Sequence, residues 1–404
     1  MTKQDIITLV SDSFESAKNG NAVNVYDSIA PLHDDGSLPE RSHYPFGWII
    51  YYALHQTPDG EIEKRKRMLA RYLRLDVAKP HKLHSMILTE AIRLHKDAKA
   101  MSFNRKTSTS GCFSIVRFSN LWDLGNLRPG DWRRKEYEGK QTGSTVEKLI
   151  TCLVAELENS HIPASADITE LADKAIAEFP DSVSILSQRA TLHMLAGELH
   201  DSRSLLRKAI ISAPGKFFLW SRLASTIDKK KDMNLYVALL HKAMDAPGPD
   251  KFKGRIRMDL AECWLSVNAF HHALWELLQT KKAYEANGWH LPKSFTAMLD
   301  RIPKDTVASN PEPLYRKTIH LADNEIYSGL SEVVAIKTFH KNPPADSRYG
   351  RPATAWRLTD EAGTNYWIQP HRYRINPDMP NGTRVAIKLH MGKPVAARLA
   401  SGIS

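Results

Sequence analysis

The spacing of apolar and polar residues changes along the chain. Over residues 61–75, four apolar residues recur at the spacing of one helix face: Met68, Leu69, Tyr72 and Leu73. Roughly opposite them lies a basic ridge of Lys64, Arg67, Arg71 and Arg74. The pattern predicts a helix over 61–75, a second over 84–99, and a helical region over 1–105. The basic ridge either faces solvent or binds a polyanion.

The helical period is lost between residues 106 and 145, where we expect an irregular but ordered connection. Its segment 120–134 combines two tryptophans, two acids and three arginines. This segment is a candidate docking site for a partner, carried by Trp122, Trp132, Arg133 and Arg134. In the alternative, the tryptophans pack the segment onto the first repeat and Arg–Asp pairs cover them.

A repeat follows over residues 146–325. Pro180 and Pro214 lie 34 residues apart, and Pro247 follows 33 residues later. Aligned on these prolines, small residues coincide at two positions: Ala190, Ala224 and Ala261 at one, and Ala175, Ala209 and Ala243 at the other. Large residues coincide as well: Leu186 with Trp220, and Leu206 with Leu240 and Leu277. Small residues permit close helix crossing, large ones fill the seam, and proline ends the second helix.

Residues 166–287 therefore resemble the tetratricopeptide repeat family, whose unit is an antiparallel pair of helices. The resemblance implies an α-solenoid with an extended surface that binds a protein or peptide. The alternative is a non-repetitive helical bundle in which the proline spacing is a coincidence.

After Tyr327 the period becomes that of strands. Five short strands are expected over residues 331–340, 353–358, 364–369, 384–390 and 394–399. By alternation, one face of the second and third strands points into a core: Trp356, Leu358, Tyr366 and Ile368. Arg357 and Trp367 then lie on the opposite face. Five strands in so short a segment are typical of a small β-barrel such as the OB-fold.

Residues 355–369 and 380–387 resemble the cold-shock and S1-type branch of the OB-fold, in which aromatic side chains of strands two and three stack unpaired bases. The resemblance places Trp367 and Gln369 on strand three, and Lys337 at a basic position of strand one. Thr338 stands where the family has tryptophan. The candidate nucleic-acid-binding residues are Lys337, Arg357, Trp367, Gln369, Arg372, Arg374 and Lys388.

Charge supports this expectation. The chain has 404 residues and a net charge of +11. From Tyr327 onward, eleven basic residues face five acids, so the last fifth of the chain carries more than half of that excess. Such an excess favours polyanionic partners, although it also serves solubility alone. Three scattered cysteines indicate a reducing compartment, and we expect a cytoplasmic protein without a membrane span.

No familiar catalytic or phosphate-binding motif occurs in the sequence. His81, His84 and His95 lack a nearby acid at ligand spacing, so we expect no metal and no cofactor. The predicted fold is mainly α, a tetratricopeptide-like α-solenoid, followed by a small OB-like β-barrel. The predicted domains are 1–105 (helical), 106–145 (connection), 146–325 (repeats) and 326–404 (barrel).

The functional expectation is a non-enzymatic adaptor. Its repeats bind a protein, and its C-terminal barrel binds single-stranded nucleic acid, RNA before DNA. One alternative is a scaffold that binds proteins alone. Another is an enzyme whose site lies in the N-terminal helices and the connection, with Asp131 and Arg133 as the residues to test.

Overall fold

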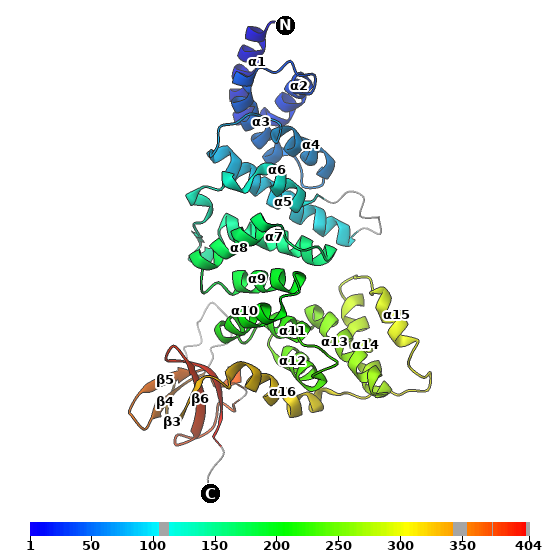
Figure 1. The fold of residues 1–404 in the computed structure, drawn as a ribbon, viewed down its shortest axis with the longest axis vertical. Coiled ribbons are helices and arrows are strands. Elements are labelled where there is room, and N and C mark those ends of the chain that lie inside the picture. Colours follow the sequence, from blue (N-terminus) through cyan, green and yellow to red (C-terminus); the bar gives the residue numbers. More distant parts are fainter. Residues whose placement is uncertain (105–112, 342–353, 374, 401–404) are drawn as a thin grey trace. The chain divides into compact units, whose positions relative to one another are not determined.

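The computed structural model describes residues 1–104, 113–341, 354–373 and 375–400. It is mostly helical and ends in an antiparallel five-stranded sheet (Figure 1). The chain divides into two compact units, residues 1–198 and 199–404, and each is described by itself. In the described part of the chain, no helix combines the length and the apolar character needed to cross a membrane.

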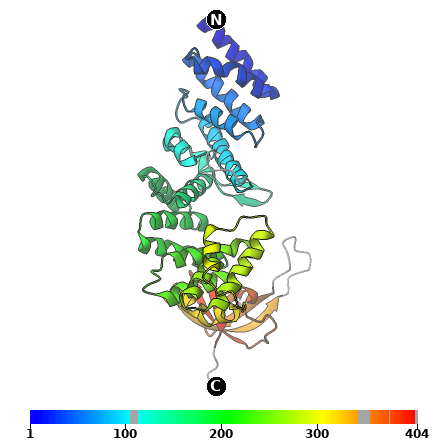
Figure 2. The ribbon, with the colours of Figure 1, turned by 90° about the vertical axis from the view of Figure 1, so that its right-hand side faces the viewer.

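Unit 1 is built from helices and one short hairpin. Its helices are α1 (Lys3–Ser16), α2 (Ala22–Asp34), α3 (His43–Gln56), α4 (Ile62–Tyr72), α5 (Lys82–Asn104), α6 (Ile115–Trp122), α7 (Thr145–Ser160), α8 (Ala166–Glu178) and α9 (Val183–Leu195). The hairpin, visible in Figure 2, pairs β1 (Lys135–Tyr137) with β2 (Lys140–Thr142). The helices predicted over 61–75 and 84–99 are confirmed as α4 and α5. The predicted connection contains α6 and this hairpin, and its residues 106–112 lie outside the described part.

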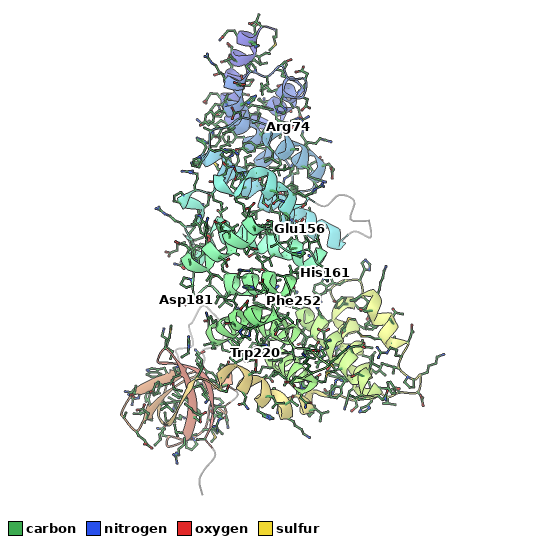
Figure 3. All side chains as sticks on the ribbon, in the orientation of Figure 1. Arg74, Glu156, His161, Asp181, Trp220 and Phe252 are labelled. Atoms are coloured by element: carbon green, nitrogen blue, oxygen red, sulfur yellow. The ribbon has the colours of Figure 1, made fainter. Side chains whose placement is uncertain are left out.

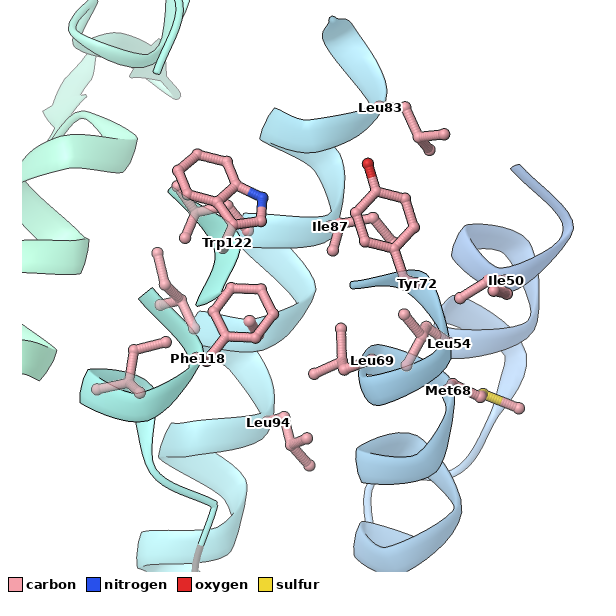
Figure 4. Packing of buried hydrophobic residues seen from close by; sticks show 14 of the residues in the cluster. Ile50, Leu54, Met68, Leu69, Tyr72, Leu83, Ile87, Leu94, Phe118 and Trp122 are labelled. Atoms are coloured by element: carbon pink, nitrogen blue, oxygen red, sulfur yellow. The ribbon is translucent and has the colours of Figure 1, made fainter. Parts of the chain in front are cut away.

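One hydrophobic core runs through unit 1. Met68, Leu69 and Tyr72, the predicted apolar stripe of α4, are buried in it, as Figure 4 shows. α7 begins with a capping box, because Ser144 Oγ accepts from the Glu147 amide at 3.1 Å and Glu147 Oε2 accepts from the Ser144 amide at 2.8 Å. These two reciprocal hydrogen bonds mark the start of α7.

Unit 2 begins with further helices. They are α10 (Leu199–Ser212), α11 (Phe217–Ser225), α12 (Met233–Asp245), α13 (Gly254–Ser266), α14 (Phe270–Glu285), α15 (Lys293–Leu299) and α16 (Glu312–Tyr327). α11 packs on α12 and α13 packs on α14. The helices α9, α11 and α13 begin at residues 183, 217 and 254, so the period is 34 residues and then 37. The longer second step includes a 3-10 turn at Asp250–Lys253.

The repeat positions of the sequence are confirmed as helix ends and seams. Pro180, Pro214 and Pro247 each come two residues after the end of a helix, α8, α10 and α12 respectively. All six coinciding alanines are fully buried, and Trp220 is as well. Small residues thus stand where helices pack closely, as the pattern indicated.

The C-terminal sheet has the strand order β5-β4-β3-β6-β7. Its strands are β3 (Ser331–Lys341), β4 (Ala355–Asp360), β5 (Asn365–Ile368), β6 (Arg384–His390) and β7 (Lys393–Leu399), and all pairs are antiparallel. All five predicted strands are confirmed to within two residues at their described ends. The sheet curls into a half-barrel, and β5 approaches β7.

Candidate nucleic-acid interface on the outer face of the sheet

The two faces of the curled sheet differ in chemistry. Its inner face is a small core that contains the four residues expected from alternation, Trp356, Leu358, Tyr366 and Ile368. The opposite, outer face carries Arg357 and Trp367, which are cross-strand partners on β4 and β5. The predicted division of these two strands between core and surface is therefore confirmed.

An exposed aromatic pair lies at one end of this outer face. Trp367 is 51% exposed and Phe339 of β3 is 44% exposed. Their ring centroids are 6.5 Å apart and the ring planes are nearly perpendicular, at 84°. Arg357 lies between them in register, and its guanidinium carbon is 5.7 Å from the centroid of the Phe339 ring. The three side chains form an aromatic platform with a cation at its centre.

Polar neighbours hold Arg357 in place. Its Nε donates to Thr338 Oγ1 at 3.2 Å, and that hydroxyl lies 3.1 Å from Thr359 Oγ1. Thr359 in turn donates to Asn365 Oδ1 at 2.9 Å. The hydrogen bonds run across three neighbouring strands and orient the guanidinium, and no carboxylate of the described residues pairs with it.

Phe339 is the member of this platform that the sequence did not reveal. Strict alternation places residue 339 on the same face as Ala335 and Lys337, which are buried in the core. A register shift between Lys337 and Phe339 leaves Thr338 as an extra residue and turns Phe339 outward beside Arg357. The resemblance to the cold-shock and S1-type branch places Thr338, one residue earlier, at the position of the family's tryptophan. No local signal in the sequence marks this bulge.

Lys337 does not belong to the outer face. It is only 3% exposed, its Nζ lies 4.5 Å from the centroid of the Trp356 ring, and it donates to the carbonyl of Met379. Burial lowers the pKa of Lys337. Since a buried ammonium does not meet a phosphate, we remove this residue from the candidate site.

The remaining candidates on the sheet are placed unequally. Lys388 lies on the outer face, but its Nζ is 3.3 Å from Glu332 Oε2. Gln369, at the end of β5, is half-buried. Arg374 lies outside the described residues, and the side chain of Arg372 is not described either.

The proposed docking segment 120–134 is packed into unit 1. Trp122 is 2% exposed and lies beside Phe118 in the core, as Figure 4 shows. Trp132 is half-buried against the same core. Asp131 is buried and accepts hydrogen bonds from Ser85 Oγ at 2.7 Å and from a backbone amide. These contacts favour packing over docking, but the ring of Trp122 lies 6.4 Å from that of His84 on α5, which precedes the repeats.

Arg134 and Arg133 differ in their surroundings. Arg134 donates to both carboxylate oxygens of Glu147, at 3.0 and 2.6 Å, and lies 4.7 Å over the Phe179 ring. Arg133 is exposed. Arg134 is exposed as well, and of the two arginines only Arg133 has no ion-pair partner among the described residues.

Most of the predicted basic ridge on α4 is neutralised by acids of α2. Lys64 pairs with Asp27 at 2.7 Å, and Arg71 and Arg74 both pair with Asp34. Among the described residues, only Arg67 of the ridge has no ion-pair partner. All of these residues except Arg74 line an open cleft of 640 Å³ between the two helices. The ion pairs weaken the polyanion interpretation of this surface.

His84, one of the three histidines weighed as metal ligands, has a structural role. Its Nδ1 lies 2.7 Å from Tyr72 Oη and its Nε2 lies 3.2 Å from the carbonyl oxygen of Ala78. His95 contacts the carbonyl of Phe113 at 3.2 Å. Burial lowers the pKa of both histidines, although Glu156, 3.7 Å from His95 Nδ1, opposes the shift there.

The fold is thus a helical chain that ends in a small β-sheet with an aromatic and basic outer face. Residues 187–322 match the family described as "Domain of unknown function (DUF7017)". The match covers about a third of the chain, includes α10 to α15, and ends before the sheet. No curated protein matches the chain.

Proposed function

We propose that the protein is a non-enzymatic adaptor whose C-terminal sheet binds single-stranded nucleic acid, RNA before DNA. The observation that carries the proposal is the platform of Trp367, Arg357 and Phe339. Unpaired bases stack on exposed aromatic rings, at about 1–3 kcal/mol per base, and an unpaired guanidinium adds attraction to phosphate. A duplex hides its base faces, so this surface favours single strands.

The strand order supports an OB-like module. In β3, β4 and β5 the chain meanders, and β6 then pairs on the other side of β3, which leaves a curled sheet with one open seam. This is the arrangement expected for a partly open five-stranded Greek-key barrel. The exposed platform lies on strands one to three of that module, the surface on which the resembled family stacks bases.

The helices supply the second arm of the adaptor. Their period of 34 and then 37 residues, the buried alanines and the helix-ending prolines support a tetratricopeptide-like array, which presents an extended surface to a protein or peptide. Phe252, labelled in Figure 3, is 55% exposed in this region and its ring lies 6.2 Å from that of Trp289. Two weak attachments on one chain raise the effective concentration of each.

The test is binding of fluorescein-labelled oligouridine, oligothymidine and a matched duplex to the full chain at two salt concentrations. We expect single strands to bind in a salt-dependent manner, and Trp367→Ala and Phe339→Ala each to weaken binding about 5- to 150-fold. Phe252→Ala is the matched control, because it removes an equally exposed aromatic ring outside the sheet. Equal affinity of Trp367→Ala and the unchanged protein would reject the proposal.

A scaffold that binds proteins alone is the second candidate. Val334 and Ile336 are 36% and 43% exposed on the same outer face, and such apolar side chains suit a protein partner. In that case neither single strand binds at either salt concentration. The enzyme alternative has weaker support, because the Asp131 carboxylate is engaged by hydrogen bonds and Arg133 faces solvent.

A further inference from the structure

We propose that Glu332 limits the length of the nucleic-acid track on the outer face, because it holds Lys388 and Arg398 in ion pairs. This inference rests on the proposed function and adds a residue that determines how much of the face takes part. Glu332 lies on β3, on the same face as Val334 and Ile336 and at the end away from Phe339.

The contacts of Glu332 engage two cations at once. It is the cross-strand partner of Lys388 on β6, and its Oε2 lies 3.3 Å from the Lys388 ammonium. Its Oε1 accepts from Arg398 of β7 at 3.1 Å. Each carboxylate oxygen thus engages one cation. Two basic residues that the charge count includes among possible phosphate contacts are thus held by one carboxylate, which offsets one of their two positive charges.

The other end of the face is different. Arg357 belongs to the platform, and Arg384 of β6 is the cross-strand partner of Ile336. No carboxylate within the described residues lies within ion-pair distance of either arginine. Among the described residues, the unpaired positive charges of the outer face are therefore those of Arg357, beside Trp367, and Arg384. They do not extend to the end of the face where Glu332 lies.

A phosphate that approaches Lys388 or Arg398 also meets the Glu332 carboxylate. The like charge repels it, and the two cations must leave an existing partner before they bind it. A single-stranded nucleic acid bound on the platform is consequently directed toward Arg384. Removal of the one negative charge frees both cations and lengthens the track.

The experiment compares the full chain with Glu332→Gln, an isosteric change, in binding of labelled oligouridine over a salt series. We expect binding about two- to tenfold tighter at low salt. Each newly engaged cation adds about 0.7 to the steepness of log K against log salt for a single strand, so we expect an increase of about 1.4. Glu361→Gln is the control, since it removes an exposed acid at the β4–β5 turn and changes the net charge equally.

A triple variant, Glu332→Gln with Lys388→Gln and Arg398→Gln, should return to the original affinity and salt dependence. If the unchanged protein binds but Glu332→Gln behaves like Glu361→Gln, the role of Glu332 is rejected and the proposed function stands. If the unchanged protein and Glu332→Gln both fail to bind at low salt, the proposed function is rejected, and this inference with it.

Discussion

Two buried titratable groups in the helices of unit 2 should give its stability opposite dependences on pH. Glu276 of α14 is fully buried and accepts from Arg257 at 2.9 Å. His241 of α12 is 2% exposed, its Nδ1 lies 2.7 Å from Thr318 Oγ1, and its ring stacks on Tyr315 with centroids 4.2 Å apart. Each group is held where its charged form is poorly solvated.

Burial raises the pKa of Glu276 from 4.5 to about 7, although Arg257 opposes the shift. The folded pKa lies above the unfolded one, so the contribution of Glu276 to stability is full below about pH 4.5 and is lost as the pH rises through 7. One pKa unit corresponds to about 1.4 kcal/mol, so a difference of about 2.5 between the folded and unfolded pKa changes the free energy of unfolding by ~3 kcal/mol.

His241 works in the opposite direction. Burial lowers its pKa from 6.5 to about 4, so its contribution is full above pH 6.5 and is lost as the pH falls through 4. The magnitude is again ~3 kcal/mol. Between pH 4.5 and 6.5 the two contributions oppose each other, and the unchanged protein should show little net effect from this pair.

Single variants should reveal each contribution. With Glu276→Gln, the opening free energy of α12–α14 should fall on acidification from pH 6.5 to 4.5, because His241 alone remains. With His241→Phe, which keeps the stacking on Tyr315, it should rise over the same range. Hydrogen exchange of peptides from α12, α13 and α14, corrected for intrinsic rates at each pH, measures this locally and does not require two-state unfolding of the whole chain.

The sign of the two slopes decides the outcome. The double variant Glu276→Gln, His241→Phe is the control. Because it lacks both titratable groups, its opening free energy should change little between pH 6.5 and 4.5. Slopes of the same sign in the two single variants would refute the reasoning, because opposite burial shifts of an acid and a base require opposite slopes.

Further predictions concern buried residues. Trp122→Ala should destabilise unit 1 by about 3–5 kcal/mol in urea unfolding, whereas a docking role predicts unchanged stability. Lys337→Met should leave both folding and the salt dependence of oligouridine binding nearly unchanged, since its ammonium contacts only a carbonyl and a ring; a loss of about 0.7 in slope would contradict its burial. Arg65→Met should cost unit 1 about 3–5 kcal/mol, because the fully buried Arg65 pairs with Asp97 at 2.8 Å; unchanged urea unfolding would contradict this pairing.

Part of the candidate site was predictable because its signal is local. Alternation over residues 355–369 correctly assigned Trp356 and Ile368 to the core and Trp367 to the surface, since neighbouring side chains of a regular strand must point to opposite faces. The helix ends before Pro180, Pro214 and Pro247 were predictable in the same way, because proline cannot continue a helix.

The rest depended on partners far away in the chain. The bulge at Thr338 lies in the pairing of β3 with β4, just past the last residue that β3 pairs with β6, and it turns Phe339 outward and leaves Lys337 in the core. The basic ridge of α4 loses most of its free charge to Asp27 and Asp34 on α2, a pairing that no spacing along the sequence indicates.

By itself, then, the sequence determined the element types, the two periods, and which face of each regular element is apolar. Only the tertiary structure decided which charges remain free and which aromatic rings meet on one surface. The physical reason is that burial pattern is set by periodicity within an element, whereas ion pairs and strand register are set by contacts between elements.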